Sequence, residues 1–358
     1  MDKRRNLFGL RQEELEAAIV EMGLPPYRAR QIYRGMYARR VAGFHEMMDL
    51  PKSLREDLEE SFYISRPKMT KHRSSEDGTI KYVFSLDDGH AVEAVYIPDT
   101  SSVSSSDAPS RVTLCLSTQV GCPLACTFCF SGTIPFARNL TVGEILGQFV
   151  GVMEENPQSP PRVNVVYMGM GEPLLNAKAV LGSLEVLTDS NALAVSPRRV
   201  TVSTAGLVKE IESFFREAPT VGLAVSLHAT DNDLRGRLMP INRKFPIEKL
   251  METIRRLPIP RRRKITFEYV LLGGENDSEQ HAFELALLLR GAKAKINLIA
   301  YNPWPGAPHK ASSAAATKRF MQVMADKGYT VSLRQSRGAD VLAACGQLAG
   351  HNMSSSGG

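Results

Sequence analysis

Residues 115–129 of this 358-residue chain read Cys-Leu-Ser-Thr-Gln-Val-Gly-Cys-Pro-Leu-Ala-Cys-Thr-Phe-Cys, and they contain four of its five cysteines. Three of these, Cys122, Cys126 and Cys129, have the spacing C-x3-C-x2-C. Thiolates this close together in one loop can converge on a metal centre. The fifth cysteine, Cys345, lies more than two hundred residues further along the chain.

Two kinds of metal centre fit this loop. Three thiolates suit an iron–sulfur cluster with one iron left open, and a [4Fe–4S] cluster is the natural size for a three-cysteine loop. Structural zinc is the competing interpretation, but it requires four ligands. The fourth could be a distant histidine or Cys115, although Cys115 lies at the edge of a predicted strand, seven residues before Cys122.

The composition is typical of a globular protein, with 43% hydrophobic and 23% charged residues. The length allows one large domain and a small one. The first residues lack the apolar segment of a signal peptide, and no apolar run approaches the roughly 18 residues of a membrane span. We therefore expect a cytoplasmic monomer that does not bind membranes. In the cytoplasm, an odd and clustered set of cysteines indicates metal or redox chemistry.

The charge distribution gives a mild indication of a polyanionic partner. The net charge is +6, and residues 1–73 contain fifteen Lys and Arg against eleven Asp and Glu. This basic N-terminal part contains two stretches with helical periodicity, around residues 11–22 and 52–61, and a helix opening after Pro25 and Pro26. Its arginine-rich faces are either solvated or in contact with a nucleic-acid backbone.

The periodicity predicts four segments along the chain. A helical accessory domain covers residues 1–75, and a β-hairpin extension with a Ser-rich surface loop covers 76–110. The hairpin strands are predicted at 80–86 and 92–97 from their alternating hydrophobic residues. The main domain covers 111–348, and 349–358 form a flexible tail.

In the main domain, short β-rich segments alternate with helical ones, which indicates an α/β fold with a parallel sheet. The strands are predicted at 112–116, 163–168, 200–204, 222–227, 265–271 and 296–300. The helices are predicted at 142–155, 177–187, 208–215, 247–256, 279–289 and 314–327. Six such units are too few for an eight-unit barrel of about 250 residues. We therefore expect an open (βα)6 partial TIM-type barrel.

Small and polar residues follow several of the predicted strands, where a parallel barrel presents its active face. The motifs are GMGEPLLN from Gly169, STAGL from Ser203, SLHA from Ser226, and Asn302 after the sixth strand. Any one of them alone is typical of a turn or a core residue. Together with the cysteine loop on the same face, they indicate a binding site.

These motifs, with Phe128 before the last loop cysteine, MPIN from Met239 and AACGQL from Ala343, resemble those of the RlmN/Cfr family of radical S-adenosylmethionine (SAM) RNA methyltransferases. The resemblance covers residues 10–350 and is closer to the RlmN branch. The Ser/Ala-rich stretch 101–110 is longer than in the family, and residues 130–135 also depart from its pattern.

The resemblance implies methylation of C2 of adenosine, in 23S rRNA at the peptidyl-transferase centre and in tRNA 3′ of the anticodon. It implies a [4Fe–4S] cluster bound by Cys122, Cys126 and Cys129, with SAM on the open iron and two SAM molecules used per turnover. Cys345 would be the methyl-carrying residue, Cys115 the residue that resolves the intermediate through a Cys115–Cys345 disulfide, and Glu93 the proton acceptor. Cys115 is the alternative proton acceptor.

The resemblance further implies a set of SAM contacts. They are Gly171, Glu172, Ser203, Ser226, Leu227, His228 and Asn302. Cluster reduction requires a low-potential electron donor that the sequence does not identify.

Two basic clusters are candidates for phosphate contacts. The first follows the fourth strand on the active face and comprises Arg235, Arg237, Asn242, Arg243 and Lys244. The second, at residues 261–264, is denser but precedes a strand, so we expect a solvated loop there. Two other functions stay open: a Cfr-like enzyme that methylates C8, and a non-catalytic metal-bearing RNA-binding factor.

Overall fold

The computed structural model describes residues 4–99 and 109–349. Most of the predicted Ser-rich loop and of the predicted C-terminal tail therefore lie outside the described residues. Among the helices in the described ranges, none has the length and hydrophobicity needed to cross a membrane.

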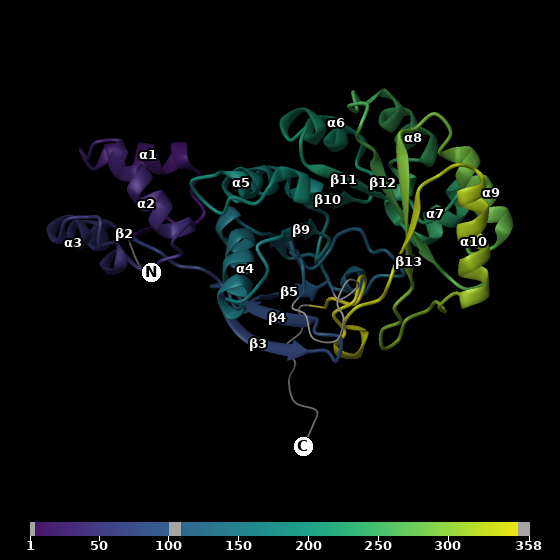
Figure 1. Ribbon diagram of the computed structural model, residues 1–358, viewed down its shortest axis with the longest axis horizontal. Coiled ribbons are helices and arrows are strands. Elements are labelled where there is room, and N and C mark those ends of the chain that lie inside the picture. The colour runs from purple at the N-terminus through teal and green to yellow at the C-terminus, as the bar shows by residue number, and fades with distance from the viewer. Residues whose placement is uncertain (1–3, 100–108, 350–358) are drawn as a thin grey trace, which may run out of the picture.

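A ten-stranded sheet forms the centre of the molecule, in the order β14-β13-β12-β11-β10-β9-β6-β5-β4-β3 (Figure 1). The parallel strands are β6 (Val112–Cys115), β9 (Val163–Tyr167), β10 (Val200–Thr204), β11 (Gly222–Ser226), β12 (Ile265–Leu271), β13 (Ala294–Ala300) and β14 (Val331–Arg334). Within the described residues, neither edge strand pairs with the other. The sheet is therefore open, as the sequence predicted.

Six helices follow the predicted strands and lie around the outside of the sheet (Figure 1). They are α4 (Val142–Glu155), α5 (Ala177–Thr188), α6 (Val208–Glu217), α8 (Ile247–Arg256), α9 (Glu279–Leu288) and α10 (Ala314–Asp326). Side-chain caps fix several of their starts; Thr141 of α4, for example, accepts the N–H of Glu144 at 3.2 Å. All six predicted strand–helix units are confirmed.

Two of the elements that the sequence analysis missed, α7 (Asn232–Leu238) and β14, lie in the main domain and follow predicted strands. α7 is only seven residues long and mostly polar, so its periodicity is weak. β14 is a four-residue strand at the sheet edge, and two of its residues are exposed. Neither segment has the alternation or length that distinguishes a strand or helix from a loop.

The predicted hairpin is confirmed as β4 (Ile80–Ser85) and β5 (Ala91–Pro98). A further strand, β3 (Lys68–Ser74), pairs with β4, and β5 pairs with β6 of the parallel sheet. Because Val95 of β5 lies opposite Cys115 of β6, the hairpin is continuous with the barrel. The division of the chain into four segments stays a prediction.

The N-terminal helices are α1 (Gln12–Glu21), α2 (Tyr27–Tyr37) and α3 (Lys52–Ser61), beside the short pair β1 (Arg5–Asn6) and β2 (Phe62–Tyr63). They lie together at one end of the molecule (Figure 1). Arg11 and Arg66 link this part to α5 and α4 through ion pairs with Glu185 and Glu154, at 3.3 and 2.6 Å.

Candidate active site

The cysteine loop lies between two short paired strands, β7 (Gln119–Val120) and β8 (Arg138–Asn139). Gly121 begins the loop with φ +72°, and a Cβ at this position would lie 2.1 Å from the carbonyl oxygen of Pro135. Only glycine fits here without moving the backbone. The thiols of Cys122, Cys126 and Cys129 are unpaired and line one cavity, which we call the loop cavity.

The three cysteines suit a cluster better than a single ion. Within residues 4–99 and 109–349, no group of three His, Cys, Asp or Glu side chains is arranged to hold one metal ion. Each cysteine ligand of an iron–sulfur cluster can bind a different iron, whereas structural zinc requires four ligands around one ion. The donor set therefore fits a [4Fe–4S] cluster with one iron left open.

Burial raises the pKa of all three loop thiols. The pKa of Cys122 rises to about 12, that of Cys126 is raised well above its ordinary value, and that of Cys129 is also raised. Backbone N–H groups oppose this effect at Cys122 and Cys129. Free thiolates are therefore unfavourable in this loop, and metal binding would compensate for burying the charge.

Most of the SAM contacts implied by the sequence lie around the loop cavity. Its lining includes Gly171, Glu172, Ser203, Ser226, His228 and Asn302. Leu227 is the exception, because its side chain is fully buried outside this lining. Its backbone N–H donates to the carbonyl of Glu268 at 3.0 Å, and its carbonyl accepts from Arg235.

The backbone after β9 has a conformation that requires glycine at position 171. Gly171 has φ +96°, and a Cβ there would lie 2.5 Å from the Cβ of Gln119. Glu172 is 2% exposed, and its two oxygens accept the N–H groups of Leu174 and Ala205, at 3.0 and 2.8 Å. Burial raises the pKa of this carboxyl to about 7 despite these hydrogen bonds. Glu172 thus connects the ends of β9 and β10.

His228 is neutral and presents a hydrogen-bond donor. Burial lowers its pKa to about 3, and its Nδ1 accepts the N–H of Val270 at 3.0 Å. The proton of the neutral ring is therefore on Nε2. Its ring packs edge-on against Phe128, with centroids 4.7 Å apart, so the cysteine loop directly contacts the segment that follows β11.

Arg235 is not accessible to phosphate, contrary to the interpretation from sequence. It is completely buried, and its guanidinium donates to the carbonyls of Ala205, Ser226 and Leu227 at 2.7, 3.1 and 3.1 Å. It also donates to Asn242, which is buried as well. These two residues hold the ends of β10 and β11 in place. Burial lowers the pKa of Arg235 to about 10.

The other members of the two basic clusters lie at the surface. Arg237, Arg243 and Lys244 are exposed beyond the end of β11. The run at 261–264 precedes β12, at the opposite end of the sheet from the loop cavity, as the sequence predicted.

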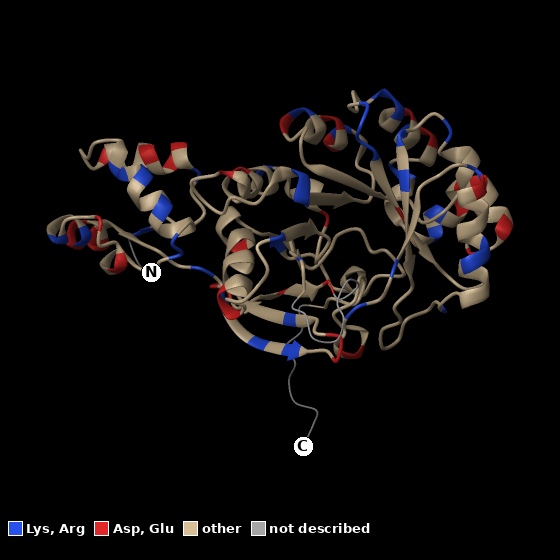
Figure 2. Cartoon of the chain, viewed as in Figure 1, with Lys and Arg blue, Asp and Glu red and all other residues tan. Residues whose placement is uncertain are grey.

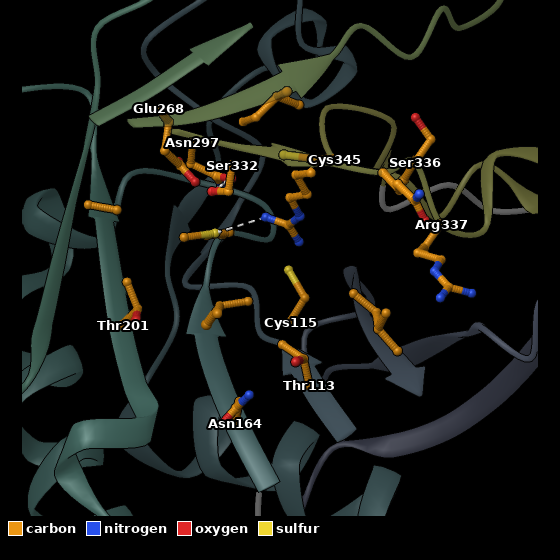
Figure 3. A pocket seen from close by; sticks show the side chains of 18 of the residues that line it. Thr113, Cys115, Asn164, Thr201, Glu268, Asn297, Ser332, Ser336, Arg337 and Cys345 are labelled. Carbon is orange, nitrogen blue, oxygen red and sulfur yellow. Dashed lines mark hydrogen bonds between the residues drawn. The ribbon is translucent and has the colours of Figure 1, made fainter. Parts of the chain in front are cut away.

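A second cavity of about 680 Å³ lies inside the barrel, and we call it the barrel cavity (Figure 3). Cys115 of β6 and Cys345 of the C-terminal segment are directed into it (Figure 3). Both thiols are unpaired. Burial raises the pKa of Cys115 to about 12 and that of Cys345 to about 11, and the positive charge of Arg334 opposes both shifts.

Cys345 also lines the loop cavity, so it lies where the two cavities meet. Asn302 donates to the carbonyl of Cys345 at 3.2 Å. The N–H of Phe130 donates to Gly346 at 2.7 Å, and Gln347 donates to the carbonyl of Pro303 at 2.7 Å. Contacts from the cysteine loop and from the end of β13 thus hold the segment that contains Cys345.

Glu93 lies behind this segment and lines neither cavity. It is 1% exposed and forms an ion pair with Lys81 at 3.4 Å, and its other oxygen accepts the N–H of Ala349 at 3.0 Å. Lys81 also donates to the carbonyl of Leu342 at 3.1 Å. This buried pair therefore contacts the Cys345 segment on both sides. Lys81 could have been found in the sequence as a charge within an apolar strand.

The fold and the three-cysteine loop define a radical SAM enzyme, and the model of the Radical SAM superfamily matches residues 116–286. The model of the ribosomal RNA large subunit methyltransferase N-terminal domain matches residues 5–64. The chain is 48% identical over 350 residues to the dual-specificity RNA methyltransferase RlmN of Geobacter sulfurreducens, covering 98% of this chain and 93% of that protein. Identity to the RlmN of Campylobacter concisus is 43%, over 97% of this chain and 92% of that protein. The chain belongs to the RlmN family of radical SAM RNA methyltransferases.

A solved structure agrees with this assignment. The crystal structure of a radical SAM methyltransferase from Sphaerobacter thermophilus superimposes with a TM-score of 0.89 at 39% identity. The match covers 97% of this chain and all of that chain. The whole fold is therefore shared, including the N-terminal helices and the C-terminal segment.

Proposed function

We propose that this enzyme methylates C2 of adenosine in 23S rRNA, at the peptidyl-transferase centre, and in tRNA, 3′ of the anticodon. The observation that carries the proposal is the position of Cys345 between a cavity lined by three cluster-type cysteines and a cavity lined by Cys115. The dual-specificity names of the relatives support two RNA substrates.

The chemistry of the target explains why this enzyme would need a radical. C2 of adenine lies between two ring nitrogens and is electron-poor, so it does not attack the electrophilic methyl group of SAM. When bound, the reduced cluster and SAM supply a 5′-deoxyadenosyl radical, which can abstract a hydrogen atom from a methyl group. Cys122, Cys126 and Cys129 would hold the cluster.

In this proposal Cys345 carries the methyl group. Its thiolate first takes the methyl of one SAM molecule, and the resulting S-methyl group later loses a hydrogen atom. The sulfur-bound carbon would then bond to C2. Passing one electron from this adduct to the oxidised cluster, and the C2 proton to a base, would restore the aromatic ring. The RNA is at that stage covalently attached to the protein.

Cys115 would release the product. Its thiolate attacks the sulfur of Cys345, which breaks the bond from sulfur to carbon and forms a Cys115–Cys345 disulfide. A proton completes the new methyl group. A thiol reductant must then reduce the disulfide with two electrons before the next turnover.

We assign proton acceptance to Glu93, with Cys115 as the alternative. Glu93 points to the same face of β5 as Val95, which lies opposite Cys115. Both of its oxygens are engaged by Lys81 and Ala349. The segment containing Ala349 would therefore have to release Glu93 when the RNA enters.

The residues around the loop cavity would bind SAM. We assign this role to Gly171, Glu172, Ser203, Ser226, His228 and Asn302, and Leu227 could take part only through its backbone. His228 would donate from Nε2. Asn302 would donate the second N–H of its amide to SAM, because the first donates to Cys345 and its Oδ1 accepts from Ser336.

RNA contacts would come from exposed basic residues on the edge strand β3 and on the N-terminal helices. Figure 2 shows Lys and Arg along α2 and β3. Arg30 and Arg34 of α2 are exposed, and so is most of β3, which contains Lys68 and Arg73. Such side chains bind phosphates without reading sequence. We further propose a cytoplasmic monomer that receives electrons from a low-potential donor.

Mass spectrometry of the modified RNA tests the proposed product. The enzyme, reconstituted anaerobically with iron and sulfide, is incubated with SAM, a reductant and either 23S rRNA fragments or tRNA. We expect 2-methyladenosine in both RNAs. A product of 8-methyladenosine would instead establish the Cfr-like reaction, and bound zinc without SAM cleavage would establish a non-catalytic factor.

A further inference from the structure

Glu268 is a buried carboxylate in the middle of an apolar strand, Ile-Thr-Phe-Glu-Tyr-Val-Leu of β12. It is 4% exposed, and its side chain lines both the loop cavity and the barrel cavity. Its Oε2 accepts a hydrogen bond from Ser203 at 2.9 Å. Its Oε1 is buried and has no hydrogen-bond partner in the described part of the chain.

The side chain of Glu268 has different polar neighbours in the two cavities. Ser203, the partner of Oε2, lines the loop cavity and not the barrel cavity. On the other side, Glu268 lies directly opposite Asn297 of β13, which is opposite Ser332 of β14. These two residues line only the barrel cavity, and Figure 3 shows them beside Glu268 on its wall. Because Oε2 is engaged by a residue of the loop cavity, Oε1 is the oxygen left for a molecule in the barrel cavity to contact.

The barrel cavity also contains the sulfur that would meet the substrate. Burial raises the pKa of Cys345, Arg334 opposes this shift, and the negative charge of Glu268 adds to it. The carboxylate is therefore within electrostatic reach of Cys345. Asp99, the other carboxylate among the described lining residues, forms an ion pair with Arg111 at 2.5 Å.

A buried carboxylate oxygen without a partner is unfavourable and calls for a donor from a ligand. We propose that Oε1 of Glu268 accepts a hydrogen bond from the exocyclic amino group of the adenine being methylated, which makes Glu268 the residue that selects adenine. This inference rests on the proposed C2 methylation. In adenine, N1 is flanked by C2 and by the amino-bearing C6, so a base with C2 at Cys345 can present its amino group to the same wall.

The proposed hydrogen bond predicts discrimination against 6-oxo purines. Hypoxanthine has a hydrogen at C2 but a carbonyl oxygen at C6, which would face the carboxylate oxygen and repel it. Purine riboside has neither group at C6, so it leaves Oε1 without a donor. A site built around a hydrogen bond rejects analogues that lack the partner group.

The test compares RNA stem-loops with adenosine or purine riboside at the target position. Wild-type enzyme should methylate adenosine faster, and Glu268→Gln, which weakens the acceptor by removing its charge, should reduce this preference about tenfold. Glu268→Ala should reduce it about 10- to 100-fold. Glu279→Gln makes the same change in an exposed residue of α9 and should leave the preference as in the wild type.

Two readouts separate the possible outcomes. Methylation of Cys345 by SAM, measured on the protein without RNA, should persist in Glu268→Gln. An unchanged preference for adenosine would overturn the inference, and so would loss of SAM binding with the preference intact, because Glu268 would then serve the cofactor. If wild-type enzyme yields no 2-methyladenosine, the proposed function fails, independently of Glu268.

Discussion

Replacing Cys345 with alanine should abolish RNA methylation while reductive cleavage of SAM continues. The variant keeps Cys122, Cys126 and Cys129, so the cluster and its SAM remain able to form 5′-deoxyadenosine. It lacks the sulfur that would hold the methyl group and bond to the RNA. Alanine is also compatible with position 345, because the two residues before it, Ala343 and Ala344, are themselves buried alanines of the same segment.

The measurement follows 5′-deoxyadenosine by chromatography and methylated adenosine by mass spectrometry in the same reaction. We expect the first product to remain and the second to fall to background. Cys126→Ala is the matched control and should lose both products, because it removes a cluster ligand. Methylated RNA from Cys345→Ala would show that the methyl group reaches the RNA by another route.

Replacing Cys115 with alanine should trap the enzyme on its substrate. In the proposed reaction Cys115 breaks the bond between Cys345 and the methylated carbon, so its absence stops the reaction after the RNA is attached. Cys115 is 7% exposed, and its partners in β5 and β9 fix its position in the barrel cavity. Water or another thiol therefore has little access to replace it.

The trapped species is a covalent complex of protein and RNA, which a denaturing gel separates from free protein. We expect about one RNA per active enzyme and almost no released 2-methyladenosine. The double variant Cys115→Ala, Cys345→Ala should give no such complex, because the attachment point is missing. Normal release of methylated RNA from Cys115→Ala, with no complex, would rule out resolution by Cys115.

The barrel could be predicted from the sequence because the hydrophobic pattern of each strand–helix unit is local. Each of the six strand–helix units has its own apolar strand and amphipathic helix, and all six are confirmed. β14 was missed because an edge strand of four residues, two of them exposed, has no such pattern. The continuity of β5 with β6 was missed for another reason: pairing across the Ser-rich loop is a long-range property.

Spacing identified the cysteine loop, whereas burial could not be predicted from spacing. Arg235 was interpreted from the sequence as a phosphate contact in a basic cluster, yet it is the buried residue that holds two strand ends. From the sequence, Gly171 was expected to let a ligand approach the backbone. In the structure, it is the side chain of Gln119 that leaves no room for a Cβ at this position. In both cases the decisive contact comes from a residue distant in sequence.

Charged residues inside predicted apolar strands could have indicated further residues of the site. Lys81, Glu93 and Glu268 are each the one charged residue of a mostly apolar strand, and all three are buried. Burying a charge is unfavourable unless it has a partner. Two of these residues pair with each other beside the Cys345 segment, and the third faces the cavity where the base would bind.

Transfer of an isotopic label tests directly whether the methyl group passes through Cys345. The enzyme is first methylated with SAM bearing a trideuterated methyl group, freed of excess SAM, and then given RNA, unlabelled SAM and reductant for one turnover. We expect the label on Cys345 before the RNA is added, and afterwards a methyl group in the RNA that retains two of its three deuterium atoms, because one is abstracted. An unlabelled methyl group in the RNA, or one with all three deuterium atoms, would contradict transfer through Cys345.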